Sequence, residues 1–169
     1  MEILIIGVLI VALMIYTSTK IKKSAAEAYE EEIFETEEFA LVKPEGFLNP
    51  IRRESEFAFE AYSKDYGEDD AETIRQGLIT VKIFTDQKFA QICKLARQSV
   101  DKVLSEENVD NRTFWLKGIK TEKDIDTEIY HKVIANNQKV FDLKITILAK
   151  VEADYSERTE KTLESFRVK

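Results

Sequence analysis

The stretch Thr127–Val151 reads TEIYHKVIANNQKVFDLKITILAKV and shows the clearest strand pattern in the chain. In its second half apolar and polar residues alternate, and the apolar set is Phe141, Leu143, Ile145, Ile147, Ala149 and Val151. A period of two is typical of a strand that buries one face. Asn136 and Asn137 separate the halves, and asparagine tolerates the positive φ of a tight hairpin turn. The stretch therefore predicts two antiparallel strands, Thr127–Ala135 and Lys139–Val151, joined by a hairpin.

The segment Gln87–Glu106 has the period of an amphipathic helix instead. At 100° per residue, its apolar side chains fall within an arc of about 120°. They are Phe89, Ile92, Cys93, Ala96, Val100, Val103 and Leu104. Thr85 or Asp86 can cap this helix, and Ser156–Phe166 predicts a second helix that contributes Leu163 and Phe166 to the core. Shorter period-two segments are Phe39–Val42, Phe57–Ala61, Ile79–Ile83 and Thr113–Ile119. Together these patterns predict an α+β fold, an antiparallel sheet with flanking helices.

The N-terminal segment has a different composition, because Ile3–Tyr16 carries no charge. Ile3–Thr19 would span roughly 26 Å as a helix, close to the roughly 30 Å of a bilayer core. Glu2 precedes this segment and no small-x-small cleavage site follows it, which favours a retained anchor over a cleavable signal peptide. No cysteine follows either, which excludes a lipoprotein anchor. The sequence therefore predicts a single transmembrane helix.

Three lysines follow the predicted span, Lys20, Lys22 and Lys23. The positive-inside rule then places the following domain in the cytoplasm. A domain on the periplasmic, lumenal or extracellular side remains the alternative. We expect three parts: the anchor with its basic flank at 1–23, a helical stalk or linker at 24–38, and the α+β domain at 39–169.

The charge of the remainder restricts the partners. From residue 24 onwards, 31 acidic and 22 basic residues give a net charge of −9, within an overall charge of −7. Such a domain is repelled by phosphate backbones and by anionic lipid, so nucleic acid is not an expected partner. Cys93 is the single cysteine, which rules out an internal disulfide and suits a reducing compartment.

Three segments, in this order, resemble the PsbP family, which is named for an extrinsic subunit of photosystem II. They are Phe39–Phe47 (FALVKPEGF), the hairpin at Asn136–Asn137 with its strands, and Leu163–Phe166 (LESF). The family usually has tryptophan where this chain has Phe47. The resemblance covers about Phe39–Val168 and implies a PsbP-like α+β sandwich. Members include photosystem subunits, assembly factors, bacterial envelope proteins and a nuclear-transport relative that binds a small GTPase. The resemblance therefore implies binding rather than catalysis.

No combination of residues predicts a catalytic, cofactor or metal site. His131 is the single histidine, and no partner for general-base or metal chemistry is evident from its neighbours. Cys93 lies on the apolar stripe, where a thiol packs as a small hydrophobe. The acidic loop Ser63–Glu72 lacks the spacing of a calcium-binding EF-hand. We therefore expect no enzyme activity, no cofactor and no metal.

Trp115 is the one candidate for protein binding. Strand alternation places it on the face opposite Phe114 and Leu116, so it is either an exposed contact residue or part of the core beneath the terminal helix. The expected function is a membrane-tethered, non-catalytic binding or assembly module that docks a partner protein or membrane complex. The alternative is a small-ligand-sensing domain or small enzyme with a pocket between helix and sheet.

Overall fold

The computed structural model describes residues 11, 13–20, 22–23, 27–50, 55–63, 65–66 and 74–169. These belong to two compact units, Met1–Glu30 and Glu31–Lys169. In the first unit, residues 13–20 and 22–23 are helical. The predicted span Ile3–Thr19 falls largely outside the described residues. Among those that are described, no helix combines the length and the apolar character that a membrane crossing requires.

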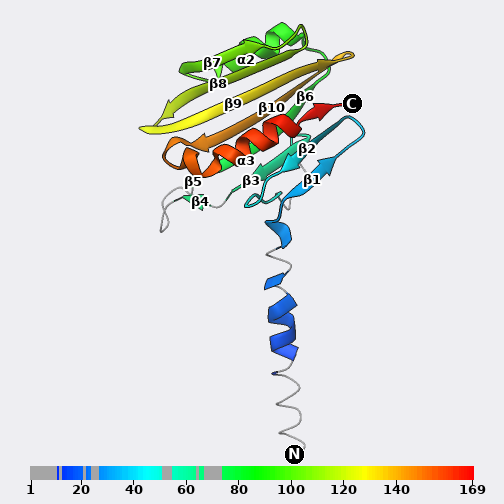
Figure 1. Cartoon of the computed structure of the whole chain (residues 1–169), viewed down its shortest axis with the longest axis vertical. Helices are drawn as coiled ribbons and strands as arrows, with labels where there is room; N and C mark the ends of the chain where they lie inside the picture. Colours follow the sequence, from blue (N-terminus) through cyan, green and yellow to red (C-terminus); the bar gives the residue numbers. More distant parts are fainter. Residues whose placement is uncertain are drawn as a thin grey trace, which may run out of the picture. The chain divides into compact units, whose positions relative to one another are not determined.

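The second unit is built on a six-stranded antiparallel sheet (Figure 1). Its strands are, in spatial order, β3 (Phe59–Tyr62), β6 (Gly77–Phe84), β10 (Lys139–Leu148), β9 (Ile125–Asn136), β8 (Thr113–Glu122) and β7 (Lys102–Asn108). A three-stranded sheet contains β1 (Glu32–Glu35), β2 (Phe39–Lys43) and β11 (Arg167–Val168), and a two-stranded one contains β4 (Asp65–Tyr66) and β5 (Ile74–Arg75). The helices are α2 (Phe89–Gln98) and α3 (Glu152–Ser165), with the 3-10 turn η1 (Ala149–Val151) before α3. The predicted α+β class is confirmed.

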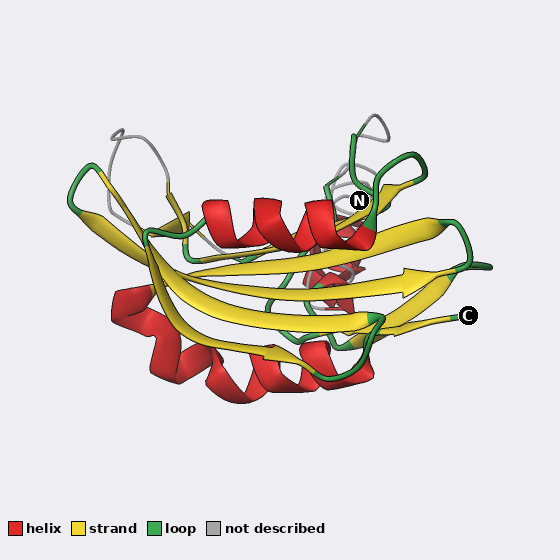
Figure 2. Ribbon diagram, turned by 90° about the horizontal axis from the view of Figure 1, so that it is seen from above, coloured by secondary structure: helices red, strands yellow, loops and turns green. Residues whose placement is uncertain are grey.

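The two helices cover opposite faces of the large sheet (Figure 2). On one face, α3 and the three-stranded sheet enclose the larger core. Its buried residues are Phe39, Leu41, Phe47, Phe59, Ala61, Ile79, Val81, Phe141, Leu143, Ile145, Ile147, Tyr155, Leu163 and Phe166. On the other face, α2 encloses a second core: Ile92, Cys93, Ala96, Val100, Phe114, Leu116, Ile129, Val133 and Val140. Strand alternation therefore supplies both cores from the same strands.

The predicted hairpin is confirmed as β9 and β10. Lys139 pairs with Asn136, and Asn137 has a φ of 55°, the left-handed conformation expected of a turn asparagine. The second strand is shorter than predicted, because Ala149–Val151 turns into η1 and leads directly into α3. The turn between β8 and β9 was not predicted. It uses two positive-φ residues, Lys123 and Asp124.

The long helix predicted at Gln87–Glu106 is wrong in its second half. The helix α2 begins after Lys88, whose backbone N–H donates to the Gln91 side chain at 3.0 Å, rather than after Thr85 or Asp86. It ends at Gln98, and Lys102–Asn108 forms β7. The chain turns closely over Gly118, where an added Cβ would lie 2.8 Å from Val100. This close approach lets β7 pair with β8, and the pairing satisfies backbone groups that a longer helix would have satisfied internally.

Residues 32–35, which the sequence placed in the helical stalk, form β1. Phe34 explains this strand, because its ring lies 4.7 Å from that of Phe59 and 5.8 Å from that of Phe39, measured between centroids. Ile33 is 70% exposed. Only one side chain of β1 therefore joins the core. Most of the predicted loop Ser63–Glu72 lies outside the described residues.

Candidate functional site

Trp115 lies on the face predicted from strand alternation. Phe114 and Leu116 are buried against α2, with 0% and 3% of their surface exposed. Trp115 points to the opposite face, where it is partly buried beside the larger core. Its direct cross-strand neighbours are Glu107 on β7 and Lys132 on β9. The tryptophan is therefore neither fully core nor fully exposed.

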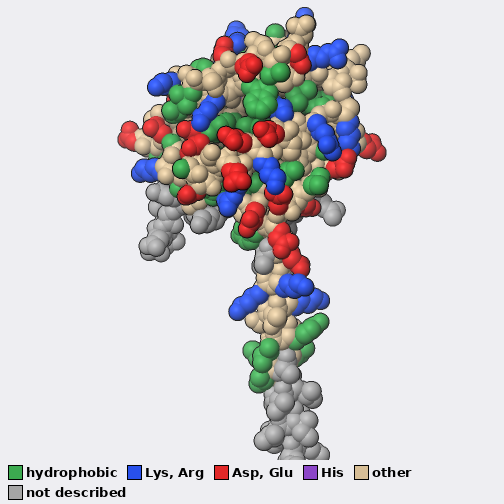
Figure 3. Space-filling model, viewed as in Figure 1, with side chains coloured by type: hydrophobic (Ala, Val, Ile, Leu, Met, Phe, Trp, Pro, Cys, Tyr) green, Lys and Arg blue, Asp and Glu red, His purple; other side chains and the backbone are tan. Residues whose placement is uncertain are grey.

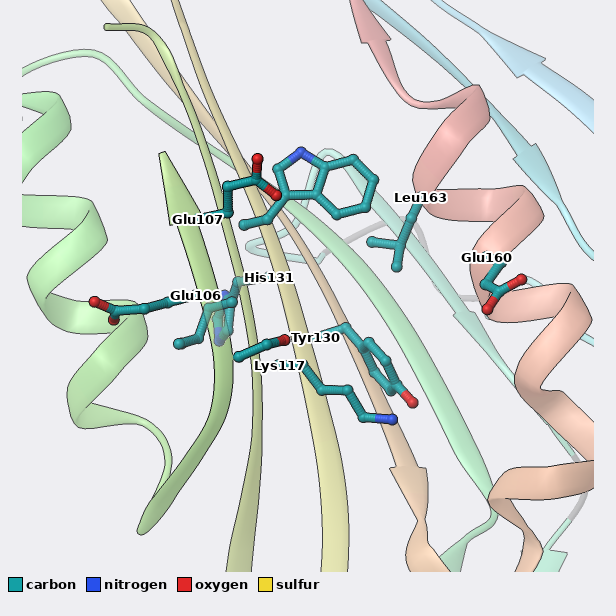
Figure 4. A pocket seen from close by; sticks show the side chains of 10 residues that line it. Glu106, Glu107, Lys117, Tyr130, His131, Glu160 and Leu163 are labelled. Atoms are coloured by element: carbon teal, nitrogen blue, oxygen red, sulfur yellow. The ribbon is translucent and has the colours of Figure 1, made fainter. Parts of the chain in front are cut away.

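An open groove of about 280 Å³ separates α3 from the outer strands around Trp115. Its lining residues are Ser105, Glu106, Glu107, Trp115, Leu116, Lys117, Tyr130, His131, Glu160 and Leu163. Figure 4 shows Glu160 and Leu163 on α3 facing Tyr130 and Lys117 on the sheet, with Glu107 on the far side. Small-molecule pockets usually enclose about 300 to 1,000 Å³. The groove volume lies just below that range and the groove is open to solvent, which suits a protein contact better than an enclosed ligand.

Lys132 lies between the Trp115 ring and the end of α3 and contacts both. Its ammonium donates to the carbonyl oxygens of Leu163 and Phe166 at 2.5 and 2.9 Å, at the end of α3. The same nitrogen lies 5.0 Å from the centroid of the Trp115 ring. Burial lowers the pKa of Lys132, and the nearby Glu164 carboxylate opposes this change. The lysine therefore joins the C-terminal end of α3 to the ring that the groove exposes.

A second charged network closes one end of the groove. Lys117 pairs with Glu128 at 2.8 Å and with Glu152 at 3.7 Å, and its ammonium lies 4.9 Å from the centroid of the Tyr130 ring. The Tyr130 hydroxyl donates to the Glu128 carboxylate at 2.7 Å, and its oxygen also lies 3.1 Å from a Glu152 carboxylate oxygen. Burial, followed by the hydrogen bond to Glu128, raises the pKa of Tyr130. The Lys117 charge is thus compensated within the protein.

Two carboxylates at the groove have no such compensation. Glu107 and Glu160 are exposed, and neither forms an ion pair with another described residue. Glu106, the neighbour of Glu107, differs, because its carboxylate accepts two bonds from the Arg97 guanidinium at 2.6 and 3.1 Å. The face that bears the groove shows hydrophobic side chains with acidic ones beside them (Figure 3). The site therefore combines an aromatic floor with uncompensated negative charge.

His131 has two partners that the sequence did not reveal. Its Nδ1 lies 2.8 Å from Asp142 Oδ1, and its Nε2 lies 3.0 Å from Ser99 Oγ. These residue types are those of a serine hydrolase relay. The Ser99 hydroxyl, however, donates its hydrogen bond to the Ala96 carbonyl oxygen at 2.6 Å, at the end of α2. His131 is 3% exposed. The arrangement fastens the end of α2 to the sheet, as expected for a histidine satisfied within the fold.

Cys93 and metal ligands contribute no further site. Cys93 is buried in the core beneath α2, and burial raises the pKa of its thiol to about 11. A buried, protonated thiol is a poor nucleophile. Within the described part of the chain, no three histidine, cysteine, aspartate or glutamate side chains gather as metal ligands would.

Comparison with known proteins defines the fold. No protein-family model and no curated protein matches the sequence. The structure is similar to the Ran-binding protein Mog1p of Saccharomyces cerevisiae, with a TM-score of 0.57 and 14% identity, covering 83% of this chain and 96% of Mog1p. It is also similar to LpqN of Mycobacterium tuberculosis, which is involved in cell envelope biogenesis, with a TM-score of 0.55 and 10% identity, covering 82% and 90%. This chain has the fold that Mog1p and LpqN share.

A cyanobacterial PsbP from Synechocystis also matches, with a TM-score of 0.48 and 8% identity over 83% of this chain and 94% of that protein. The predicted resemblance to the PsbP-like group is confirmed at the level of fold through Mog1p and LpqN, which share that fold. At these identities the likeness establishes the architecture and assigns no functional residue.

Proposed function

We propose that this protein is a membrane-tethered, non-catalytic module that docks a partner protein through the groove around Trp115. The observation that carries the proposal is the support of Trp115. The indole stacks on the buried Lys132, contacts the larger core, and still contributes to an open groove. A tryptophan held in place before binding loses little side-chain entropy on contact. Tryptophan is also among the residues that most often dominate interface energies.

The fold relatives agree with a binding role. Mog1p binds Ran, and LpqN takes part in cell envelope biogenesis. The described part of this chain offers no site with nucleophile, base and substrate cavity in one place, because the Ser99 hydroxyl is held by the helix end. A protein partner is therefore the best-supported ligand class.

The tether rests on the first unit. Five of its described apolar side chains are more than half exposed: Val11, Leu13, Met14, Ile15 and Tyr16. Exposed apolar residues along a helix are costly in water and favourable in lipid. Lys20, Lys22 and Lys23 follow, which favours a cytoplasmic domain, with the opposite side of the membrane as the alternative. Tethering raises the effective concentration at the bilayer, so weak docking to a membrane complex suffices.

The docking test compares Trp115→Ala with Phe57→Ala in the full-length, detergent-solubilised protein. Phe57 is a matched control, because it is also partly exposed and has a lysine ammonium, that of Lys82, 5.7 Å from its ring centroid. Loss of a hot-spot tryptophan weakens binding by at least about thirtyfold. We expect the stoichiometric partner to co-purify with wild type and Phe57→Ala but not with Trp115→Ala. A melting temperature that falls for Trp115→Ala as much as for a core truncation, with partner binding retained, would show that Trp115 acts only in packing.

The tether test uses Leu9→Arg with Val11→Arg. A charged residue at the bilayer centre costs about 2.5 to 3.5 kcal/mol on insertion scales, so the double variant should leave the membrane pellet after a carbonate wash.

The topology test uses Asp86→Cys, which provides an exposed thiol, while the native Cys93 is buried and serves as the unreactive background. A thiol reagent that cannot cross membranes should label Asp86→Cys only after lysis. Labelling of intact cells would place the domain outside.

A further inference from the structure

The strand β7 forms an open edge of the large sheet. It is the terminal strand in the sheet order, next to β8 alone, and all seven of its residues are exposed. The Val109 N–H donates to the Thr113 carbonyl at 3.0 Å. Because an antiparallel strand alternates its bonding direction, Ser105 and Glu107 also bond inward to β8. The N–H and C=O groups of Glu106 and Asn108 therefore point outward.

The usable part of this edge is short. The register shifts between Val103 and Ser105, and such a bulge twists an edge and discourages pairing. Beyond the bulge, Ser105–Asn108 pairs regularly with β8. On this segment the Glu106 carboxylate points to the α2 side and pairs with the Arg97 guanidinium. The Glu107 carboxylate points to the groove side and forms no ion pair with another described residue. The one regular segment of the edge thus lies directly beside the groove.

We infer that the partner contributes an extended, basic segment that pairs with the outer edge of Ser105–Asn108 and directs an arginine or lysine into the groove. This inference rests on the proposed function and names its partner class. In a new pair of strands, the residue opposite Glu107 would lie on the groove side, where opposite charges stabilise. Glu107 and Glu160 supply the negative charge, and the Trp115 ring supplies a surface for a cation. Main-chain bonds to Glu106 and Asn108 would fix the register.

A second copy of this chain fits the same edge poorly. Twofold antiparallel pairing through the outward groups of Glu106 and Asn108 would centre on Glu107 and place the two copies of Glu107 directly opposite each other. Like charges directly opposite each other destabilise a strand pair. The charge of the edge therefore selects a basic segment over self-association.

The test uses a short blocked peptide in which arginine alternates with valine and threonine, added to the full-length protein in detergent. Trp115 is the single tryptophan of the chain, so its fluorescence reports on the groove without a label. We expect a saturable change in emission, and none with a peptide that has glutamate in place of arginine. Glu107→Gln combined with Glu160→Gln should weaken binding about tenfold, since charge-assisted contacts are lost.

Proline separates backbone pairing from side-chain contact. Asn108→Pro removes an outward N–H that β8 does not use, and an edge strand tolerates proline at such a position. It should weaken peptide binding about tenfold, whereas Asn108→Ala, which keeps the N–H, should bind like wild type. Glu106→Pro against Glu106→Ala repeats the comparison at the second outward residue. A peptide N-methylated at alternate residues tests the same bonds from the ligand side, even if a proline variant does not fold.

Two kinds of result would overturn the inference. In the first, the proline variants bind the peptide as tightly as wild type, and the N-methylated peptide binds as tightly as the unmodified one, with the same change in emission. Side chains alone would then dock in the groove. The proposed function would survive, but without strand pairing. Absence of peptide binding, or a concentration-dependent dimer that Asn108→Pro abolishes, would mean that the edge does not accept a basic segment. Independence of the native partner from Trp115 would instead refute the proposed function itself.

Discussion

Replacing Lys132 with methionine should destabilise the domain, although the substitution removes a buried charge. Lys132 is 8% exposed, and its ammonium donates to the carbonyls of Leu163 and Phe166 at the end of α3. Hydrogen bonds from charged groups contribute about 1.5 to 3 kcal/mol each, and a buried carbonyl left without a donor costs about 1 to 3 kcal/mol. Relief of the lysine's own desolvation offsets part of this loss. We expect the free energy of unfolding to fall by about 2 to 4 kcal/mol.

Lys144→Met provides the control. Burial also lowers the pKa of Lys144, but its ammonium makes no hydrogen bond to another described residue. Methionine should therefore be neutral or mildly stabilising there, within about 1 kcal/mol. Urea unfolding of the fragment Glu31–Lys169 measures the free energy of unfolding of both variants. In a thermal scan of the same fragment, Lys132→Met should lower the melting temperature by roughly 5 to 15 °C. Similar stabilities for the two variants would refute the assignment of Lys132 as the residue that holds α3.

Three further predictions follow from burial. Ile92→Ala should lower the free energy of unfolding by about 2 to 5 kcal/mol. Leu95→Ala, at a half-exposed position on the same helix, should lower it by less than about 0.5 kcal/mol. Equal losses in denaturant titrations would mean that the buried face of α2 is wrongly assigned. Because the pKa of Cys93 is raised to about 11, the native thiol should resist a thiol reagent at pH 8 and react after unfolding in urea; rapid native labelling would contradict its burial. Since the folded-state pKa of Tyr130 lies above its unfolded value, its contribution is complete below about pH 10 and is lost as pH rises further. Tyr130→Phe should flatten that alkaline decline in stability, and an unchanged pH profile would exclude Tyr130 as its source.

The parts of the fold that depend on local periodicity could be predicted from the sequence. The alternation from Phe141 to Ile147 identified the central strand, and Asn137 identified its turn. The stripe of α2 was correct through Ala96. The same reasoning placed Trp115 opposite its neighbours, because side-chain direction in a strand follows from spacing alone.

The parts that depend on distant partners could not be predicted in this way. Val103 and Leu104 continue the helical period of α2, yet both are 43% exposed on β7. The strand exists because Gly118, on another strand, lets the chain turn closely and pair. Likewise, Lys132 reads as an ordinary strand lysine, and its role is set by α3 carbonyls more than thirty residues away. Tertiary pairing overrides local propensity at such positions.

The short strand β1 is the first element of the domain that tension on its N-terminal side would reach. It is the first strand of the folded unit, and it is held by Phe34, by four paired residues, and by an ion pair of 3.2 Å between Glu32 and the buried Lys43. If tension on a docked domain detached β1, the freed segment Glu31–Glu38 would span up to roughly 27 Å at about 3.4 Å per residue. The remaining core residues belong to other elements and would stay packed. If the proposed tether holds the domain, release of β1 would thus lengthen the connection while the strands of the larger core stay paired.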